Sequence, residues 1–260
     1  MKNRILPLLL LCASLFAARS WEEIVASKEL RIAIRVREGV LSPEKNSGFH
    51  YDLARAFAKK QGLTLKLVVK STLNDYFTSG LFNEADVVCD NVTILPERAE
   101  KMKFVEFLAI KQILVTKKGH IPLTTLARLA DETIIVAKDS SYYAGIQEKE
   151  KEAKVAFKYF FSATTADQIK DLMADKGTVT ILDSNLAAEK LLEDELSLHK
   201  AISARQMIGW GVEKSQATLA LKLTEFLEEA RRDAKSGLFS NVWTKYIQGI
   251  SYDEYLKIAQ

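Results

Sequence analysis

The segment at residues 85–107, ADVVCDNVTILPERAEKMKFVEF, contains side chains whose types and spacing could bind a small anion. A buried strand is predicted to lead into a loop that carries Asn91 and Thr93, and Pro96 then precedes Arg98. Proline is favourable in the first turn of a helix, so Arg98 is expected just inside a helix whose free N–H groups face the loop. Backbone donors, a threonine hydroxyl and a guanidinium together can hold a carboxylate. On the residues alone, a surface ion pair between Arg98 and a neighbouring glutamate is the simpler interpretation.

The motifs of several enzyme classes are missing from the sequence. There is no GxGxxG, GxxxxGK[ST], HExxH or GxSxG pattern, so dinucleotide, phosphate-loop, zincin and serine-hydrolase chemistry lack their signatures. The three histidines, His50, His120 and His199, are far apart and lack the spacing of metal ligands. The two cysteines cannot form a CxxC pair or a cysteine-rich zinc site. We therefore expect no catalytic residue, no metal and no cofactor.

The charge of the chain argues against nucleic acid as a partner. The formal net charge is +3, but residues 1–20 contain three basic residues and no acidic one. The rest of the chain therefore has 34 Lys and Arg against 34 Asp and Glu, a balance that gives no attraction to a phosphate backbone.

Residues 1–20 are predicted to be a secretory signal peptide, because a short basic start is followed by an apolar run and then by small residues. The apolar run is too short to span a bilayer, and no later stretch could do so. We expect cleavage after Ser20, with Ala17 as the alternative last residue of the leader. Lipidation of Cys12 stays open, although Leu11 stands where such sites need a small residue. The mature protein is expected in the periplasm and not to span the membrane.

Strand and helix patterns alternate along the chain and predict an α/β fold. Short connections between these elements favour parallel strands. The strands are expected at residues 29–36, 63–69, 85–89, 132–137, 156–161 and 179–182. The helices are expected at residues 51–61, 72–82, 141–154, 166–175, 184–192 and 216–235.

Several motifs give the chain a resemblance to a known family. Residues 48–54 read GFHYDLA, residues 86–98 follow the pattern of a ligand loop ending in Pro-Glu-Arg, residues 182–185 read LDSN, and residues 207–212 read MIGWGV. From about Trp21 onward the chain resembles the family 3 periplasmic solute-binding proteins that serve amino-acid ABC transporters. Within that superfamily it is most similar to the substrate-binding-like domain of membrane-bound lytic transglycosylase F.

The resemblance implies a two-lobe periplasmic-binding-protein-like fold of type II. Each lobe would be a mainly parallel sheet flanked by helices, with two crossovers at the hinge. Residues 21–110 and 209–260 would form lobe 1, and residues 111–208 would form lobe 2. A monomer that closes on a small solute in the cleft is expected.

The same resemblance assigns ligand-binding roles. Arg98 and Thr93 would hold an α-carboxylate, with the backbone of Asn91 assisting, and Asp183 from the other lobe would hold an α-ammonium. Such a zwitterion requires opposite charges on opposite walls. A cap on the following helix is the alternative role for Asp183.

At other positions the resemblance allows more than one role. Ser140 and Ser141 correspond to a turn that could meet an anion, or they cap a helix. Arg35 stands where many family members have Asp, with Glu38 close behind. If Arg35 faces the cleft, an acidic solute is favoured, and the alternative is that Arg35 points to solvent. The aromatic residues expected to sandwich the ligand are missing from residues 37–42, and Phe49 or Tyr142 are the candidates to replace them.

The sequence thus predicts an exported binding protein that clamps an amino acid or a related acidic solute for uptake through an ABC permease. The first alternative is a sensory or regulatory protein of the periplasm that binds a muropeptide or a partner. The less favoured one is an enzyme similar to cyclohexadienyl dehydratase, with Asp183 or Glu38 as general acid. The solute and the cognate permease are not identified by the sequence.

Overall fold

The computed structural model describes residues 18–36, 40–42, 44–190 and 196–259. Contacts within the chain divide it into two compact units. The first comprises the described residues up to Asp90, together with Leu95–Val105 and Trp210–Thr224. The second comprises Asn91–Ile94, Glu106–Gly209 and the described residues from Glu225 onward. No helix in these described ranges is both long and apolar enough to cross a membrane.

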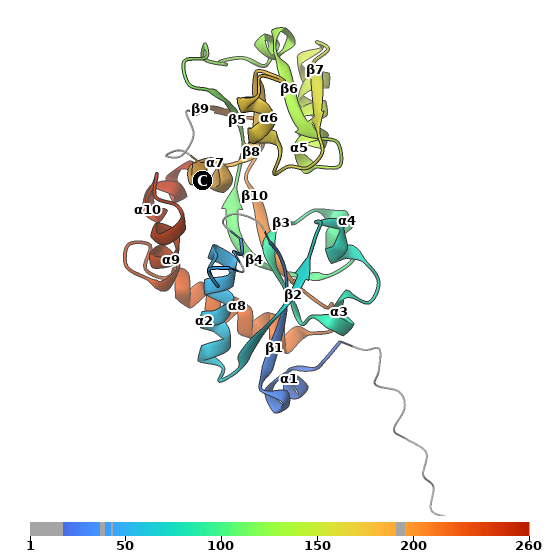
Figure 1. The fold of residues 1–260 in the computed structure, drawn as a ribbon, viewed down its shortest axis with the longest axis vertical. Helices are drawn as coiled ribbons and strands as arrows, with labels where there is room; N and C mark the ends of the chain where they lie inside the picture. Colours follow the sequence, from blue (N-terminus) through green and yellow to red (C-terminus); the bar gives the residue numbers. More distant parts are fainter. Residues whose placement is uncertain (1–17, 37–39, 43, 191–195, 260) are drawn as a thin grey trace, which may run out of the picture. The chain divides into compact units, whose positions relative to one another are not determined.

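The first sheet has five strands and can be followed in Figure 1. Its order is β2 (Thr64–Lys70), β1 (Glu29–Arg35), β3 (Val87–Thr93), β10 (Gln206–Val212) and β4 (Lys103–Ile110). Strand β1 runs parallel to both β2 and β3, as the short connections predicted. Strand β3 extends to Thr93, so Asn91 and Thr93 lie on a strand and the prediction that they lie in a loop is wrong. The strand continues because Ile94 still donates its N–H to Met207.

The helix α2 (Phe49–Lys60) begins at the GFHYDLA motif. Its preceding residue, Gly48, has a φ of +156°, and a Cβ there would lie 2.2 Å from the carbonyl oxygen of Val40, so only glycine fits. His50 is buried and accepts a hydrogen bond from the indole N–H of Trp210 at 2.9 Å. The motif therefore fixes how α2 packs.

The helix predicted over residues 72–82 is wrong. The structure has a 3-10 turn η1 (Asn74–Phe77) and a single helical turn α3 (Leu81–Glu84) instead. Gly80 between them has a φ of +90°, a conformation that interrupts a right-handed helix. The Asp75 carboxylate also accepts the N–H groups of residues 71 and 72, local bonding that competes with a regular helix.

The second sheet also has five strands and is mixed. Strand β6 runs parallel to its neighbours, whereas β5 runs antiparallel to both of its own. The order is β7 (Lys158–Ser162), β6 (Thr133–Ala137), β8 (Val179–Asp183), β5 (Gln112–Lys117) and β9 (Leu196–Ala201).

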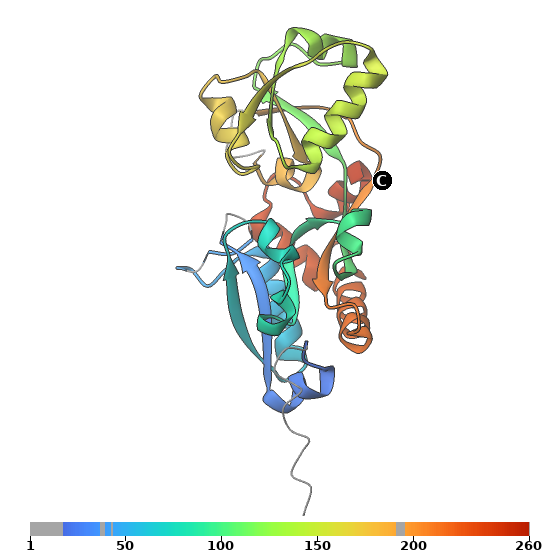
Figure 2. The same cartoon turned by 90° about the vertical axis from the view of Figure 1, so that its right-hand side faces the viewer.

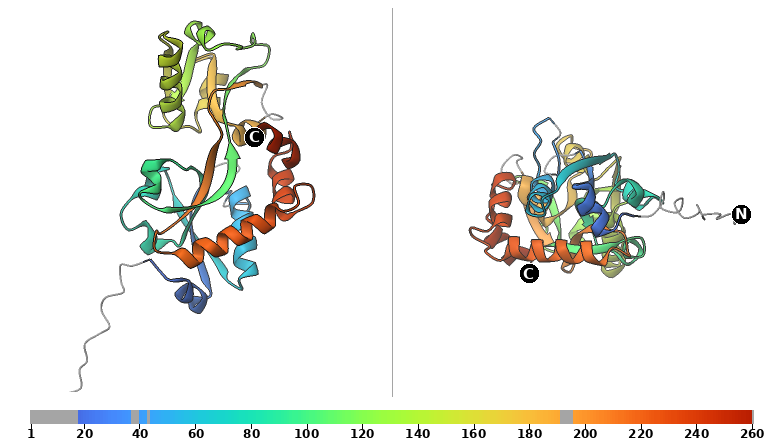
Figure 3. Two further views of the ribbon diagram at one scale, coloured as in Figure 1. Left: turned by 180° about the vertical axis from the view of Figure 1, so that it is seen from behind. Right: turned by 90° about the horizontal axis from the view of Figure 1, so that it is seen from below.

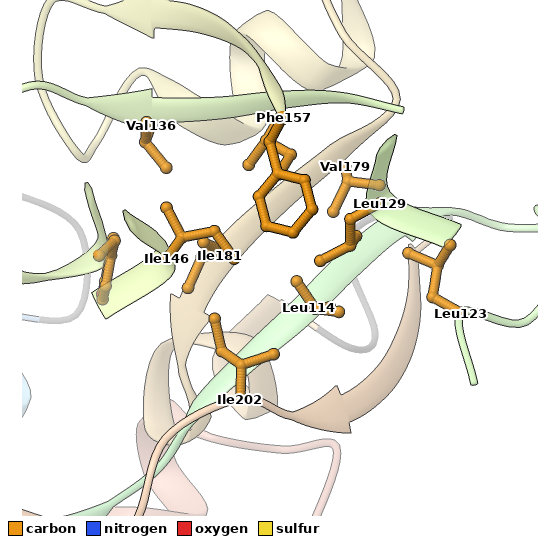
Figure 4. Packing of buried hydrophobic residues seen from close by; sticks show 11 residues of the cluster. Leu114, Leu123, Leu129, Val136, Ile146, Phe157, Val179, Ile181 and Ile202 are labelled. Atoms are coloured by element: carbon orange, nitrogen blue, oxygen red, sulfur yellow. The ribbon is translucent and has the colours of Figure 1, made fainter. Parts of the chain in front are cut away.

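Two apolar clusters cover opposite faces of this sheet, which Figure 2 shows from the side. Ile134 and Val136 belong to one cluster and Ile135 to the other, as consecutive strand residues face opposite sides. Helix α5 (Ser141–Ala153) contributes Ile146 to the first cluster, whereas α6 (Gln168–Met173) and α7 (Ser184–Lys190) pack with the second. The 3-10 turn η2 (Leu126–Asp131) completes the first cluster, which is drawn in Figure 4.

Helices α8 (Ala217–Arg231), α9 (Leu238–Tyr246) and α10 (Tyr252–Ala259) follow β10 and are coloured from orange to red in Figure 3. Helix α8 ends before the predicted residue 235 because Asp233 accepts the N–H groups of residues 235 and 236 and forms a turn. The ring centroids of Tyr252 and Tyr255 lie 5.3 Å and 4.5 Å from that of Trp243, so these aromatic residues pack α9 against α10.

The first described residues are part of the fold of the first unit. Ser20 caps α1 (Trp21–Ser27) in a reciprocal capping box with Glu23, and Arg19 binds the buried carboxylate of Asp86. A leader that ends at Ser20 would include both residues. Cleavage after Ser20 stays a prediction, and the alternative boundary at Ala17 falls outside the described residues.

Candidate functional site

Arg98 lies in the short helix α4 (Pro96–Ala99), which begins at Pro96 as the sequence predicted. The helix follows β3 after Ile94 and Leu95, so Arg98 is carried at the carboxyl end of a central strand. Its side chain is half-buried, and its guanidinium carbon lies 5.5 Å from the ring centroid of Phe77 in η1. Thr93 is buried and Asn91 is half-buried on β3. Ligands of open α/β sheets bind at this edge, outside the carboxyl ends of the strands.

Arg35 forms a buried ion pair that the sequence analysis did not anticipate. Its Nε donates to Oδ2 of Asp90 at 2.6 Å, and its Nη2 donates to Oδ1 at 3.2 Å. The hydroxyl of Tyr76 donates to the same carboxylate at 2.7 Å. The side chain of Arg35 is 14% exposed and that of Asp90 is 0% exposed, so Arg35 does not point to solvent.

The electrostatics of this network follow from its burial. Burial by itself lowers the pKa of Arg35, but the charge of Asp90 and its hydrogen bonds outweigh burial and raise it. Burial raises the pKa of Tyr76, and the charge of Asp90 adds to that increase. Arg35 therefore stays charged and Tyr76 stays protonated, which keeps the hydroxyl a hydrogen-bond donor to Asp90.

Asp183 is the last residue of β8 and is buried. Its N–H donates to the hydroxyl of Tyr142 at 3.1 Å. Burial raises the pKa of Tyr255, and the charge of Asp183 adds to that increase. Tyr255 also donates to the backbone oxygen of Ala109 at 2.6 Å and shares a hydrogen bond of 2.9 Å with Ser184. A network of hydroxyl groups thus holds the end of β8 in place.

The remaining predicted site residues take several positions. Ser140 is the N-cap of α5 and accepts the N–H of Tyr143 at 3.2 Å, so the capping alternative describes it. Ser141 accepts a hydrogen bond of 3.4 Å from the side chain of Gln112. Glu38 lies outside the described residues.

Phe49 and Tyr142, the two residues expected to replace the missing ligand-sandwiching aromatics, are both buried. Phe49 is 6% exposed and packs against His50, and Tyr142 is 4% exposed in the core below α5. Their rings are part of the packing of α2 and α5. In the second unit, Asn185 of the LDSN motif donates from Nδ2 to Oδ1 of Asn91 at 3.4 Å, a contact that the sequence analysis did not assign.

A hollow of about 510 Å³ lies in the first unit beside η1. Its lining includes the rings of Phe77 and Phe82 and the charged residues Lys101 and Glu213. Phe77 therefore contacts this hollow as well as Arg98. Across the described ranges, no cluster of three His, Cys, Asp or Glu side chains could hold a metal ion.

Comparison with known proteins gives relatives in sequence and in structure. The chain is 26% identical over 212 residues to the membrane-bound lytic murein transglycosylase F of Aliivibrio fischeri, which covers 79% of this chain and 43% of that protein. The chain thus spans about half the length of the curated relatives it matches.

Two solved structures show the same fold. One is an ancestral amino acid-binding protein described as a precursor of cyclohexadienyl dehydratase, with a TM-score of 0.70, 18% identity, and coverage of 87% of this chain and 98% of that one. The other is a binding component of an ABC transporter from Wolinella succinogenes complexed with lysine, with a TM-score of 0.70, 21% identity, and coverage of 85% and 96%. They identify the fold as the two-lobe type II periplasmic-binding-protein fold. The model of one family, the bacterial extracellular solute-binding proteins of family 3, matches residues 39–246, and the chain belongs to that family.

Proposed function

We propose that this chain is an exported binding protein that clamps a small carboxylate-bearing solute, an amino acid or a related acid, for uptake through an ABC permease. The observation that carries the proposal is a pair of opposite charges at equivalent places in the two sheets. Arg98 follows the central strand of the first sheet, and the buried Asp183 ends the central strand of the second.

In this proposal the guanidinium of Arg98 binds the α-carboxylate of the solute in bidentate fashion. The hydroxyl of Thr93 and the backbone at Asn91 add donors to the same group. The carboxylate of Asp183 binds the α-ammonium. A ligand that engages both units favours the closed state by its differential affinity for that state, and a permease can recognise the closed state.

The structural relatives support an amino acid as the ligand class, since one is complexed with lysine and another is an ancestral amino acid-binding protein. The curated relatives favour a second candidate. They are named murein transglycosylases, and the chain covers less than half of their length. In that case the chain is a binding module for a cell-wall fragment such as a muropeptide.

A thermal-shift screen with the twenty L-amino acids, small monocarboxylates and dicarboxylates, and muropeptides tests both candidates. A ligand present at 100 times its Kd stabilises the protein by about 2.7 kcal/mol. We expect an amino acid to produce this shift, and Arg98→Ala and Asp183→Ala each to abolish it. Lys257→Ala is the control and should keep the shift, because the Lys257 side chain is 70% exposed and pairs with an aspartate whose side chain is also exposed.

The possible outcomes separate the candidates. A shift with a muropeptide but with no amino acid would replace the first candidate with the second. A shift with an amino acid that survives both Arg98→Ala and Asp183→Ala would contradict the assigned site. Turnover of prephenate or arogenate by the wild-type chain would contradict a function limited to binding.

A further inference from the structure

Two consecutive rings of η1 each lie beside a different guanidinium. The guanidinium carbon of Arg35 lies 5.8 Å from the ring centroid of Tyr76, and that of Arg98 lies 5.5 Å from the ring centroid of Phe77. Guanidinium groups at such distances are attracted by the aromatic quadrupole. One short turn therefore positions both arginines near the carboxyl edge of the first sheet.

Asp90 neutralises one of these two arginines. Both oxygens of its carboxylate accept hydrogen bonds from Arg35, and Tyr76 donates a third bond to it. The pairing follows from the register of parallel strands: Ile32 lies opposite Val87 and Ala33 opposite Val88 in β1 and β3, and the same register continued brings residue 35 opposite residue 90. A fully buried carboxylate bound in this way cancels the charge that Arg35 would otherwise present.

We propose that Asp90 sets the charge class of the ligand: by occupying Arg35, it withholds a second guanidinium and restricts the site to solutes with one carboxylate. The inference rests on the proposed function, because Arg98 is there assigned to the α-carboxylate. A second carboxylate on the solute would be desolvated without a cation to pair with it, because Arg35 is already paired with Asp90, and this is unfavourable. Dicarboxylic amino acids are therefore selected against, and amino acids with neutral or basic side chains are accepted.

Asp90→Asn tests the proposal. Asparagine has the same shape, and its one oxygen can still accept from Tyr76 and from Nε of Arg35. It loses the bond from Nη2 of Arg35 and leaves the charge of Arg35 uncompensated. We expect the ratio of affinities for L-glutamate and L-glutamine, measured by isothermal titration calorimetry, to shift about tenfold toward L-glutamate. An unchanged ratio overturns the proposal.

The chain offers a matched control at the same pair of strands. The carboxylate of Asp86 is also buried and binds Arg31 as well as Arg19. Asp86 directly precedes β3, and Arg31 lies four residues before Arg35 on β1, about 13 Å away along the sheet. Asp86→Asn makes the same change of charge there. We expect it to leave the affinity ratio within about twofold of wild type. An equal shift in both variants would mean that net charge alone is responsible and would overturn the proposal.

The double variant Arg35→Gln/Asp90→Asn provides an independent test if Asp90→Asn folds poorly. It removes both charges together, and circular dichroism checks its fold. Because Arg35 does not contact the solute in this proposal, the double variant should bind the wild-type ligand with a Kd within about twofold of wild type. It should gain no affinity for L-glutamate. A loss of tenfold or more would show that Arg35 contacts the ligand and would overturn the proposal.

The results also distinguish this inference from the proposed function. If the wild type binds an amino acid but Asp90→Asn gains no preference for L-glutamate, the inference alone fails. If the wild type binds no solute of the screen while Asp90→Asn binds L-glutamate, the proposed function fails. That result supports the inference that Asp90 keeps Arg35 from pairing with a solute carboxylate. A folded Asp90→Asn variant that binds no dicarboxylate overturns the inference, whatever the wild type binds.

Discussion

Replacing Arg19 with alanine should destabilise the first unit, because this residue near the start of the described chain makes contacts that belong to a folded core. Its Nε donates to Oδ1 of Asp86 at 3.0 Å, and its Nη2 donates to Oδ2. Nη1 donates to the Ser27 hydroxyl at 2.8 Å, and Nη2 also donates to the backbone oxygen of Glu29 at 3.0 Å. The carboxylate of Asp86 is 1% exposed, and the Arg19 side chain is 20% exposed.

The cost of Arg19→Ala is limited by a second arginine. Arg31 donates to Asp86 from Nη2 at 3.1 Å and from its backbone N–H at 2.7 Å, so the buried carboxylate keeps partners when Arg19 is removed. Hydrogen bonds to charged groups contribute about 1.5–3 kcal/mol, and we therefore expect a loss of about 2 kcal/mol. Asp86→Ala removes the carboxylate that pairs with Arg19 and Arg31, and it should lower the free energy of unfolding by more, about 3–5 kcal/mol. For a chain of this length, 2 kcal/mol corresponds to a decrease in Tm of about 4–8 °C.

Thermal unfolding followed by circular dichroism measures this effect. Lys257→Ala is the control, because the side chains of Lys257 and its partner Asp253 are both exposed, and it should change stability by less than about 0.5 kcal/mol. An Arg19→Ala variant as stable as that control would refute the reasoning. The same contacts predict that protein recovered after export still contains Arg19. An amino-terminal sequence that starts at Trp21 would contradict this prediction.

Two further predictions concern pH and backbone conformation. The pKa of His199 is lowered by burial and by the neighbouring His120, and its Nδ1 accepts the N–H of Leu123 at 3.3 Å, so the unfolded chain binds a proton on this histidine more readily than the folded chain. The free energy of unfolding, measured with denaturant, should therefore fall as the pH decreases from about 6.5 through the folded pKa. His199→Gln should reduce that loss, and an unchanged loss would contradict this origin. Gly48→Ala should lower the free energy of unfolding by about 3 kcal/mol, because at its φ of +156° a Cβ would lie 2.2 Å from the carbonyl oxygen of Val40. Gly119→Ala, at a φ of +85° with open space around the added Cβ, should lower it clearly less in the same denaturant unfolding experiment. Equal losses would contradict a role for the close approach to Val40.

Much of the fold could be predicted because local patterns determine it. The alternation of residues 29–36 gave β1 (Glu29–Arg35), and the apolar face of residues 51–61 gave α2, which starts two residues earlier at Phe49. The prediction of a single helix over residues 72–82 was wrong. There the conformation of Gly80 and the local bonding of Asp75 outweigh the pattern.

The candidate site could be predicted only where a motif marks it. The proline before Arg98 places that residue in a helix from the sequence alone. The pair of Arg35 and Asp90 joins residues 55 positions apart, and only the parallel register of two strands brings them together. The only available signal was an aspartate inside the apolar run VVCDNV, a position where a buried charge needs a partner. Tyr142 was assigned to the site for its type, whereas its position on α5 buries it in the core.

The most direct test of the central claim is a crystal structure of the chain with the amino acid that gives the largest thermal shift. The account predicts the solute carboxylate within about 3 Å of the Arg98 guanidinium and its ammonium within about 3 Å of the Asp183 carboxylate. It also predicts that Arg35 stays paired with Asp90 in that complex. A solute bound in contact with neither Arg98 nor Asp183 would contradict the account.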